Sequence, residues 1–237
     1  MRAGKVYVIG DIHGCAEELG VLLDELAPRS TDTVVCLGDY IDRGPDAKAV
    51  IERLLALQMS GPRCVFLKGN HEDMFLAYAG QHGHFGDAFR FNGGDATLES
   101  YGLGDFSGAE LWEALPPEHR AFFQSLQLTF RWQDFLCVHA GLDPRRPLGD
   151  QDEEDLLWIR HEWIQPPHSF GCTVIFGHTP MRQPFLQWPY KIGIDTGLVY
   201  GNRLTCLVLP ELEFVQVPRG GTRATRWLPP ESWRDPA

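Results

Sequence analysis

The first third of the chain alternates short apolar runs typical of strands with segments of helical periodicity. Strand-like runs lie at residues 5–9, 33–37 and 64–67. Between them, aliphatic residues recur at helical spacing, first over residues 19–26 and then over 50–55. A strand–helix–strand–helix–strand order predicts a parallel sheet at the start of the chain.

The rest of the chain is less regular. We expect helices at 72–79 and 117–125, with an irregular surface excursion over 80–117, which is rich in Gly, His and acidic residues. The acidic run 150–155 is expected to open one helix that continues to about residue 164, because the helix dipole stabilises acids in a first turn; a partner surface is the alternative. Strand-like runs at 126–132 and 135–138 precede it, and a β-meander is expected from the runs at 173–176, 185–188, 191–194, 204–209 and 213–217.

Length and composition indicate one globular unit. The chain has 237 residues, of which 43% are hydrophobic and 22% charged, so we expect a single domain over 1–217 and a poorly ordered tail over 218–237. The net charge of −11 disfavours binding to nucleic acid or to an anionic membrane. Neither a membrane span nor a signal-peptide core is recognisable, which predicts a cytoplasmic protein. The six cysteines form no CxxC pair and are expected to be reduced and buried.

Metal-ligand side chains cluster where strand-like runs end. Five such segments read GDIHG from Gly10, GDYIDRG from Gly38, GNHE from Gly69, HAG from His139 and GHT from Gly177. The carboxyl ends of strands in an open α/β sheet share one edge, so loops that are far apart in sequence converge there. Six side chains can therefore meet at one point: Asp11, His13, Asp39, Asn70, His139 and His178.

This ligand set suits two metal ions. Each residue alone has a plain alternative, as a turn or cap residue or as a buried, hydrogen-bonded histidine. Together, three imidazoles, two carboxylates and one amide oxygen are too many for one small ion with an open position, and a carboxylate can bridge two ions. Oxygen and nitrogen ligands without thiolate favour Mn, with Fe or Zn as alternatives, over calcium.

In this order the five segments resemble the signature of the metal-dependent phosphoprotein phosphatases, in the bacterial or lambda-phage-type branch of the calcineurin-like metallophosphoesterases. The resemblance covers about residues 5–209. It implies an α/β fold, a four-layer α-β-β-α sandwich with a dinuclear centre at the carboxyl ends of the strands. It also implies that His71 is the general acid, that Asp42 orients it, and that the ligands divide into Asp11, His13 and Asp39 for one ion and Asp39, Asn70, His139 and His178 for the other.

The chemistry requires groups in these roles. Two divalent ions lower the pKa of a bridging water, so that hydroxide is available for in-line attack on phosphorus, and an imidazole can protonate the leaving group. Phosphate is expected to bind Arg43, Asn70 and Arg160; the guanidinium of Arg43 offers a planar fork. Lambda-phage-type phosphatases carry an arginine like Arg160 after a Leu-Trp pair. A shared helical stripe with Leu157 and Ile164 supports that role, with a structural ion pair as the alternative.

The preferred interpretation is a phosphomonoester hydrolase, a protein serine/threonine phosphatase that acts on a phosphorylated protein or a small phosphoester. The alternative is a symmetrical bis(5'-nucleosyl)-tetraphosphatase, which shares nearly all these segments, or a related nucleotide phosphatase. Asp42 and Thr179-Pro180 favour the phosphatase, because the symmetrical enzymes lack an acid at the first position and have Trp after the last ligand histidine. A non-catalytic phosphate-binding protein is disfavoured, because every expected ligand is present. The Asn92-Gly93-Gly94 insert resembles one in bacterial members and is expected to wall the cleft, with a plain turn as the alternative.

Overall fold

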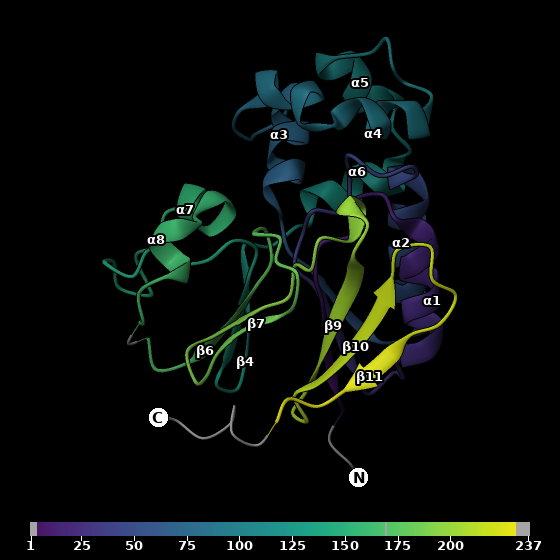
Figure 1. The fold of residues 1–237 in the computed structure, drawn as a ribbon. Helices are drawn as coiled ribbons and strands as arrows, with labels where there is room; N and C mark the ends of the chain where they lie inside the picture. The colour runs from purple at the N-terminus through teal and green to yellow at the C-terminus, as the bar shows by residue number, and fades with distance from the viewer. Residues whose placement is uncertain (1–3, 169, 231–237) are drawn as a thin grey trace.

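Two β-sheets form the centre of the protein, as seen in a computed structural model that describes residues 4–168 and 170–230 (Figure 1). The first sheet has the strand order β11-β10-β9-β1-β2-β3 and the second the order β4-β5-β6-β8-β7. The first sheet contains β1 (Val6–Ile9), β2 (Thr33–Cys36), β3 (Arg63–Phe66), β9 (Arg203–Leu209), β10 (Glu213–Pro218) and β11 (Thr225–Trp227). The second contains β4 (Thr129–Trp132), β5 (Phe135–Val138), β6 (Thr173–Phe176), β7 (Phe185–Gln187) and β8 (Lys191–Gly193).

Helices cover the outer face of each sheet (Figure 1). The α-helices are α1 (Ala16–Leu26), α2 (Ala47–Ser60), α3 (Asn70–Tyr78), α4 (Gly94–Tyr101), α5 (Gly108–Ala114), α6 (Pro117–Gln124), α7 (Glu153–Trp158) and α8 (His161–Ile164). The described residues also form the short 3-10 helices η1 (Gly86–Ala88), η2 (Arg90–Asn92) and η3 (Leu198–Tyr200). In Figure 1, α7 and α8 lie outside the second sheet, α1 and α2 lie outside the first, and α3, α4 and α5 lie at the top.

The alternation of side chains along the strands builds these layers. On β1, Val6 and Val8 belong to the buried cluster between the sheets, whereas Tyr7 and Ile9 belong to the cluster under α1 and α2. Leu136 on β5 belongs to a third cluster, with residues of α7 and α8. The predicted four-layer α-β-β-α sandwich is therefore confirmed. Five of the six cysteines are buried, as expected, whereas Cys64 is half-buried.

Strand direction places the loops of interest together. β1, β2 and β3 are parallel, as predicted, and β5, β6 and β8 are parallel to one another in the second sheet. The loops at the carboxyl ends of these strands carry the predicted ligands. The sandwich therefore supplies one edge to which both sheets contribute.

Residues 80–117 do not form the expected irregular excursion. They contain η1, η2, α4 and α5, and their apolar side chains enter the core cluster under the first sheet. Phe89 and Leu111 are completely buried there. The prediction was wrong because the Gly-rich composition concealed short helices that are stabilised by packing against other elements.

The expected single helix ending near residue 164 is divided in two. Its first part, α7, ends at Trp158; Ile159 is extended, with φ −60° and ψ 140°, and α8 begins at His161. Leu157, Arg160 and Ile164 consequently do not share one helical stripe. The expected β-meander is also wrong, because β6, β7 and β8 belong to the second sheet and β9 and β10 to the first.

The chain after residue 218 is ordered as far as residue 230, contrary to expectation. β11 pairs antiparallel with β10, and the ring of Trp227 stacks on Phe214 with centroids 4.5 Å apart. The guanidinium of Arg219 pairs with the buried carboxylate of Glu18. Residues 231–237 lie outside the described residues, and the domain boundary at 217 stays a prediction. Within the described ranges, no helix is long and apolar enough to cross a membrane.

Candidate metal centre and active site

Five loops bring the predicted residues to the shared edge of the two sheets. Asp11 and His13 follow β1, the segment 39–43 follows β2, and Asn70 and His71 open α3 directly after β3. His139 follows β5 and His178 follows β6. All of these side chains are buried, except that of Arg43, which is half-buried.

Unusual backbone conformations concentrate in these loops. His13, Asp39, Asp42, Arg43 and His178 all have positive φ, between 47° and 70°. They are five of the nine non-glycine residues with positive φ in the described part of the chain. Such conformations cost on the order of 1–3 kcal/mol each and persist where the surrounding structure holds them, which is typical of functional sites.

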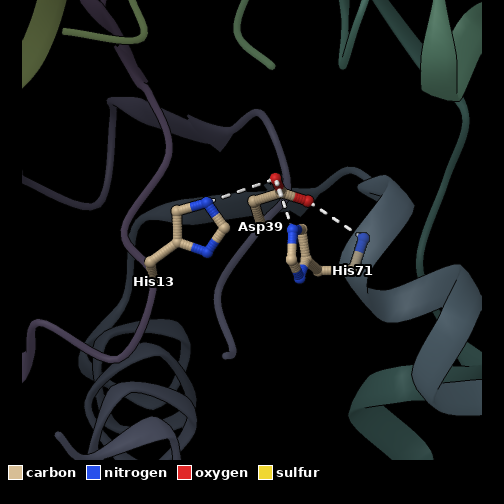
Figure 2. Close-up of side chains that lie close together, drawn as sticks. All are labelled: His13, Asp39 and His71. Carbon is tan, nitrogen blue, oxygen red and sulfur yellow. Dashed lines mark hydrogen bonds and ion pairs between the residues drawn. The ribbon is translucent and has the colours of Figure 1, made fainter. Parts of the chain in front are cut away.

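Asp39 lies at the centre of the cluster. Its Oδ2 is 3.4 Å from His13 Nε2 and 4.0 Å from His71 Nε2, and these three side chains converge from separate segments (Figure 2). Its Oδ1 is 3.4 Å from His139 Nε2. Two groups that can hold a metal ion therefore share this carboxylate: His13, Asp39 and His71, and Asp39, His139 and His178. Burial opposes ionisation of Asp39, but the surrounding histidines keep its pKa below the ordinary value.

Backbone carbonyls orient two of the histidines. His13 Nδ1 donates to the carbonyl of Ile41, and His139 Nδ1 donates to that of Leu37, each at 2.9 Å. The proton thus resides on Nδ1, and the lone pair of Nε2 faces Asp39. Burial lowers the pKa of His13 to about 3 and also lowers that of His139, so both rings are neutral. Neutral imidazoles around a buried carboxylate are a donor set that fits divalent transition metals.

Asn70 joins the second group. Its Oδ1 lies 3.0 Å from His139 Nε2 and 2.8 Å from His178 Nδ1. The carboxylate of Asp11 accepts a hydrogen bond of 3.0 Å from the backbone N–H of His178, and Asp11 belongs to neither of the two metal-capable groups found among the described residues. Burial and the nearby Asp195 and Asp39 raise the pKa of Asp11. Its predicted role as a ligand of the first ion stays a prediction.

A buried chain of hydrogen bonds leads to His71. Its Nδ1 lies 2.6 Å from Asp42 Oδ2, and Asp42 Oδ1 accepts a hydrogen bond of 2.6 Å from the hydroxyl of Thr97. The backbone N–H of Asp42 donates back to that hydroxyl at 2.8 Å. Although burial opposes protonation, Asp39 and Asp42 raise the pKa of His71. Thr97, on α4, was missed because nothing local in the sequence links it to Asp42.

Two arginines contact the cluster, each at a histidine of a different metal-capable group. Arg43 Nη1 lies 3.0 Å from His13 Nε2, and Arg160 Nε lies 3.0 Å from His178 Nε2. Arg160 has no carboxylate within ion-pair distance among residues 4–168 and 170–230, so that alternative is not supported. Arg160 reaches the site through the break between α7 and α8, not through the helical stripe that the sequence suggested.

Glu72 is a second residue whose role the sequence did not reveal. Its Oε1 accepts hydrogen bonds from the N–H groups of Tyr40 and Ile41, and its Oε2 accepts them from Asp39 and Gly69. All four donors belong to the loops that follow β2 and β3. The fully buried carboxylate therefore ties together the two loops that carry Asp39 and His71.

The glycine-rich insert contacts Arg43. The backbone N–H of Arg43 donates to the carbonyl of Gly93 at 3.0 Å. Gly93 has φ +100°, and a Cβ there would lie 2.7 Å from Arg43 Cγ, so a glycine is required for this close approach. The insert therefore packs against Arg43, and its expected role as a wall of the cleft stays a prediction.

Comparisons with known proteins agree with this architecture. Residues 4–209 match the family model of the calcineurin-like phosphoesterases. The asymmetrical bis(5'-nucleosyl)-tetraphosphatase PrpE of Oceanobacillus iheyensis is 29% identical over 90% of this chain and 92% of its own length. The corresponding protein of Bacillus thuringiensis is 28% identical over 90% of this chain and 94% of its own length.

Solved structures agree as well. A crystal structure provisionally described as a diadenosine tetraphosphatase is 26% identical, covers 92% of this chain and 94% of its own, and has a TM-score of 0.69. A cold-active protein-tyrosine phosphatase of a psychrophilic Shewanella is 17% identical, with 94% of this chain and 80% of its own covered and a TM-score of 0.63, which shows a common fold only. With the buried His/Asp groups, the family match shows that the chain is a metallophosphoesterase and belongs to the calcineurin-like phosphoesterase family.

Proposed function

We propose that the protein is a metal-dependent hydrolase of dinucleoside tetraphosphates that cleaves its substrate asymmetrically. The observation that carries this proposal is similarity over nearly the whole length, 90% of this chain and 92% of the relative, to a protein described as an asymmetrical tetraphosphatase. The sequence alone favoured a protein phosphatase, with the symmetrical tetraphosphatase or a related nucleotide phosphatase as the alternative. Asp42 and Thr179-Pro180 argued only against the symmetrical enzymes, so they are compatible with asymmetrical cleavage.

The proposed function includes the residues that bind the two metal ions. Asp11, His13 and Asp39 would hold one divalent ion, and Asp39, Asn70, His139 and His178 would hold the second. When bound, these ions supply positive charge for the phosphate and lower the pKa of water at the site. A donor set of oxygen and nitrogen without thiolate suits manganese, iron or zinc, and manganese is the metal that we propose first.

The chain's own residues bind the substrate and supply a proton. Arg43 and Arg160, which contact histidines of different groups, hold phosphate oxygens from two sides, and Asn70 adds an amide. His71 holds a proton that it donates to the leaving oxygen, while Asp42 keeps its ring in position. Water adds to one phosphorus, the bridging P–O bond breaks, and asymmetrical cleavage of diadenosine tetraphosphate yields AMP and ATP.

A protein serine/threonine phosphatase is the second candidate function. The observation that favours it is the buried His71–Asp42 pair, with Nδ1 2.6 Å from Oδ2. An oriented, protonated imidazole is most valuable when the leaving group is an alkoxide, such as that of serine, because an alkoxide leaves poorly without a proton.

Steady-state kinetics in excess Mn²⁺ separates the two candidates. We expect a higher kcat/KM on diadenosine tetraphosphate than on phosphoserine peptides, with AMP and ATP as chromatographic products. Two molecules of ADP would contradict asymmetrical cleavage, and a preference for the peptide would support the second candidate. Asp39→Asn, purified identically, is the control for contaminating hydrolases, because the shared carboxylate lies at the centre of both groups.

A further inference from the structure

A hollow beside the active site is bordered by two exposed aromatic rings. Its volume is about 510 Å³, and it is lined by Arg43, Phe91, Asn92, Gly93, Val199 and Tyr200. Phe91 is 97% exposed and Tyr200 is 63% exposed. Large apolar side chains on a protein surface are ordinary when scattered, but two at one hollow next to a catalytic loop point to a ligand.

Short, well-anchored turns present both rings. Phe91 lies on η2, between Phe89, which is completely buried, and Gly93, whose carbonyl accepts a hydrogen bond from Arg43. Tyr200 ends η3, whose first residue, Leu198, is 2% exposed. The backbone is therefore held by core contacts, while the two aromatic side chains remain available in solvent.

Arg43 connects the hollow to the metal-capable cluster. Its Nη1 lies 3.0 Å from His13 Nε2, and its Cζ lies 5.6 Å from the centroid of the Tyr200 ring. One guanidinium thus faces the proposed phosphate site and an aromatic face at the same time. A ligand whose phosphate is held by Arg43 can therefore place its next chemical group in the hollow that Tyr200 and Phe91 line.

We propose that this hollow is a subsite for a nucleoside base of the substrate, stacked on Tyr200 and Phe91; this inference rests on the proposed function. Aromatic side chains stack on the π-face of any base, so the subsite accepts nucleotides with little selectivity among bases. None of the lining residues lies in a strand, so an extended peptide finds no sheet edge to pair with there. The chemistry of the rim therefore favours a flat heterocycle over a phosphopeptide.

The test compares two product-like inhibitors that differ only in the base. Adenosine 5'-monophosphate and ribose 5-phosphate carry the same sugar phosphate, so the ratio of their inhibition constants isolates the base. We expect the wild-type enzyme to bind the nucleotide roughly 5- to 100-fold more tightly. Phe91→Ala and Tyr200→Ala should each reduce this ratio several-fold, and leave inhibition by ribose 5-phosphate unchanged. Phe91→Tyr should restore the wild-type ratio.

Met59→Ala is the matched control, because Met59 is 90% exposed and lies on α2, away from the hollow. A wild-type ratio near one overturns the subsite, and so does an equal weakening of both inhibitors in the aromatic variants. A different result overturns the proposed function: a wild-type enzyme that prefers a phosphoserine peptide to diadenosine tetraphosphate. A high inhibitor ratio with that preference would retain the base subsite and reject the dinucleotide as substrate.

Discussion

Replacing Thr97 by valine removes one hydroxyl from the buried chain of hydrogen bonds that leads to His71. Valine keeps the branched shape of threonine, so the change creates little cavity. It deprives Asp42 of two partners: Oδ1 loses a donor at 2.6 Å, and the backbone N–H loses an acceptor at 2.8 Å. Thr97, Asp42 and His71 are at most 1% exposed, so water does not replace these partners.

The expected loss of stability follows from the two hydrogen bonds. A hydrogen bond to a charged acceptor contributes about 1.5–3 kcal/mol and a neutral one about 1 kcal/mol. We therefore expect Thr97→Val to lower the free energy of unfolding by about 2–4 kcal/mol. For a chain of this size the corresponding fall in Tm is roughly 4–16 °C. Thr97→Ser keeps the hydroxyl and should lose much less.

Activity supplies a readout that a purely structural role would not change. If Asp42 orients His71, Thr97→Val should lower kcat on a phosphoserine peptide about tenfold, because serine alkoxide requires a proton. The kcat on p-nitrophenyl phosphate should change little, because nitrophenolate leaves without one. Thr97→Ser should restore the wild-type ratio of the two rates. Wild-type stability together with an unchanged ratio in Thr97→Val would refute this reasoning.

Three further predictions concern stability, each measured by urea unfolding at equilibrium. Glu72→Gln places an amide NH₂ against two backbone N–H donors and should cost about 2–4 kcal/mol; a loss below 0.5 kcal/mol would contradict its role between the two loops. Lys191→Met should cost a similar amount, because the buried ammonium donates to three backbone carbonyls, whereas Lys48→Met on the surface should be neutral. Arg219→Gln should cost about 1–2 kcal/mol at pH 7. Although burial raises the pKa of Glu18, hydrogen bonds from Gly220 N–H and Arg219 lower it below its value in the unfolded chain. The loss of stability in Arg219→Gln should therefore be complete above the unfolded pKa of Glu18 and disappear as the pH falls through the folded pKa. A loss of stability that does not depend on pH would contradict this prediction.

The parallel strands and the convergence of their loops could be predicted from the sequence. The period of two along β1 divides its side chains between two cores, and a strand–helix–strand unit returns the chain to the same edge of the sheet. These are local properties of the chain. The approach of Asp39, Asn70, His139 and His178 was predictable because each of these residues follows a strand-like run.

Other features depend on surfaces that distant segments supply, and these could be seen only in the folded protein. The helices within 80–117 and strand β11 had weak local signals, and they are stabilised by burying Phe89 in the core under the first sheet and by stacking Trp227 on Phe214. Arg160 reaches His178 because the chain breaks between α7 and α8.

The hydrogen bonds that hold the residues of the site in place also depend on tertiary structure. Thr97 stands 55 positions from Asp42, and Glu72 bonds to Tyr40, which is 32 positions away. A hydrogen bond between such residues leaves no periodic trace in the sequence, because its geometry exists only after the elements that carry its two ends have packed together.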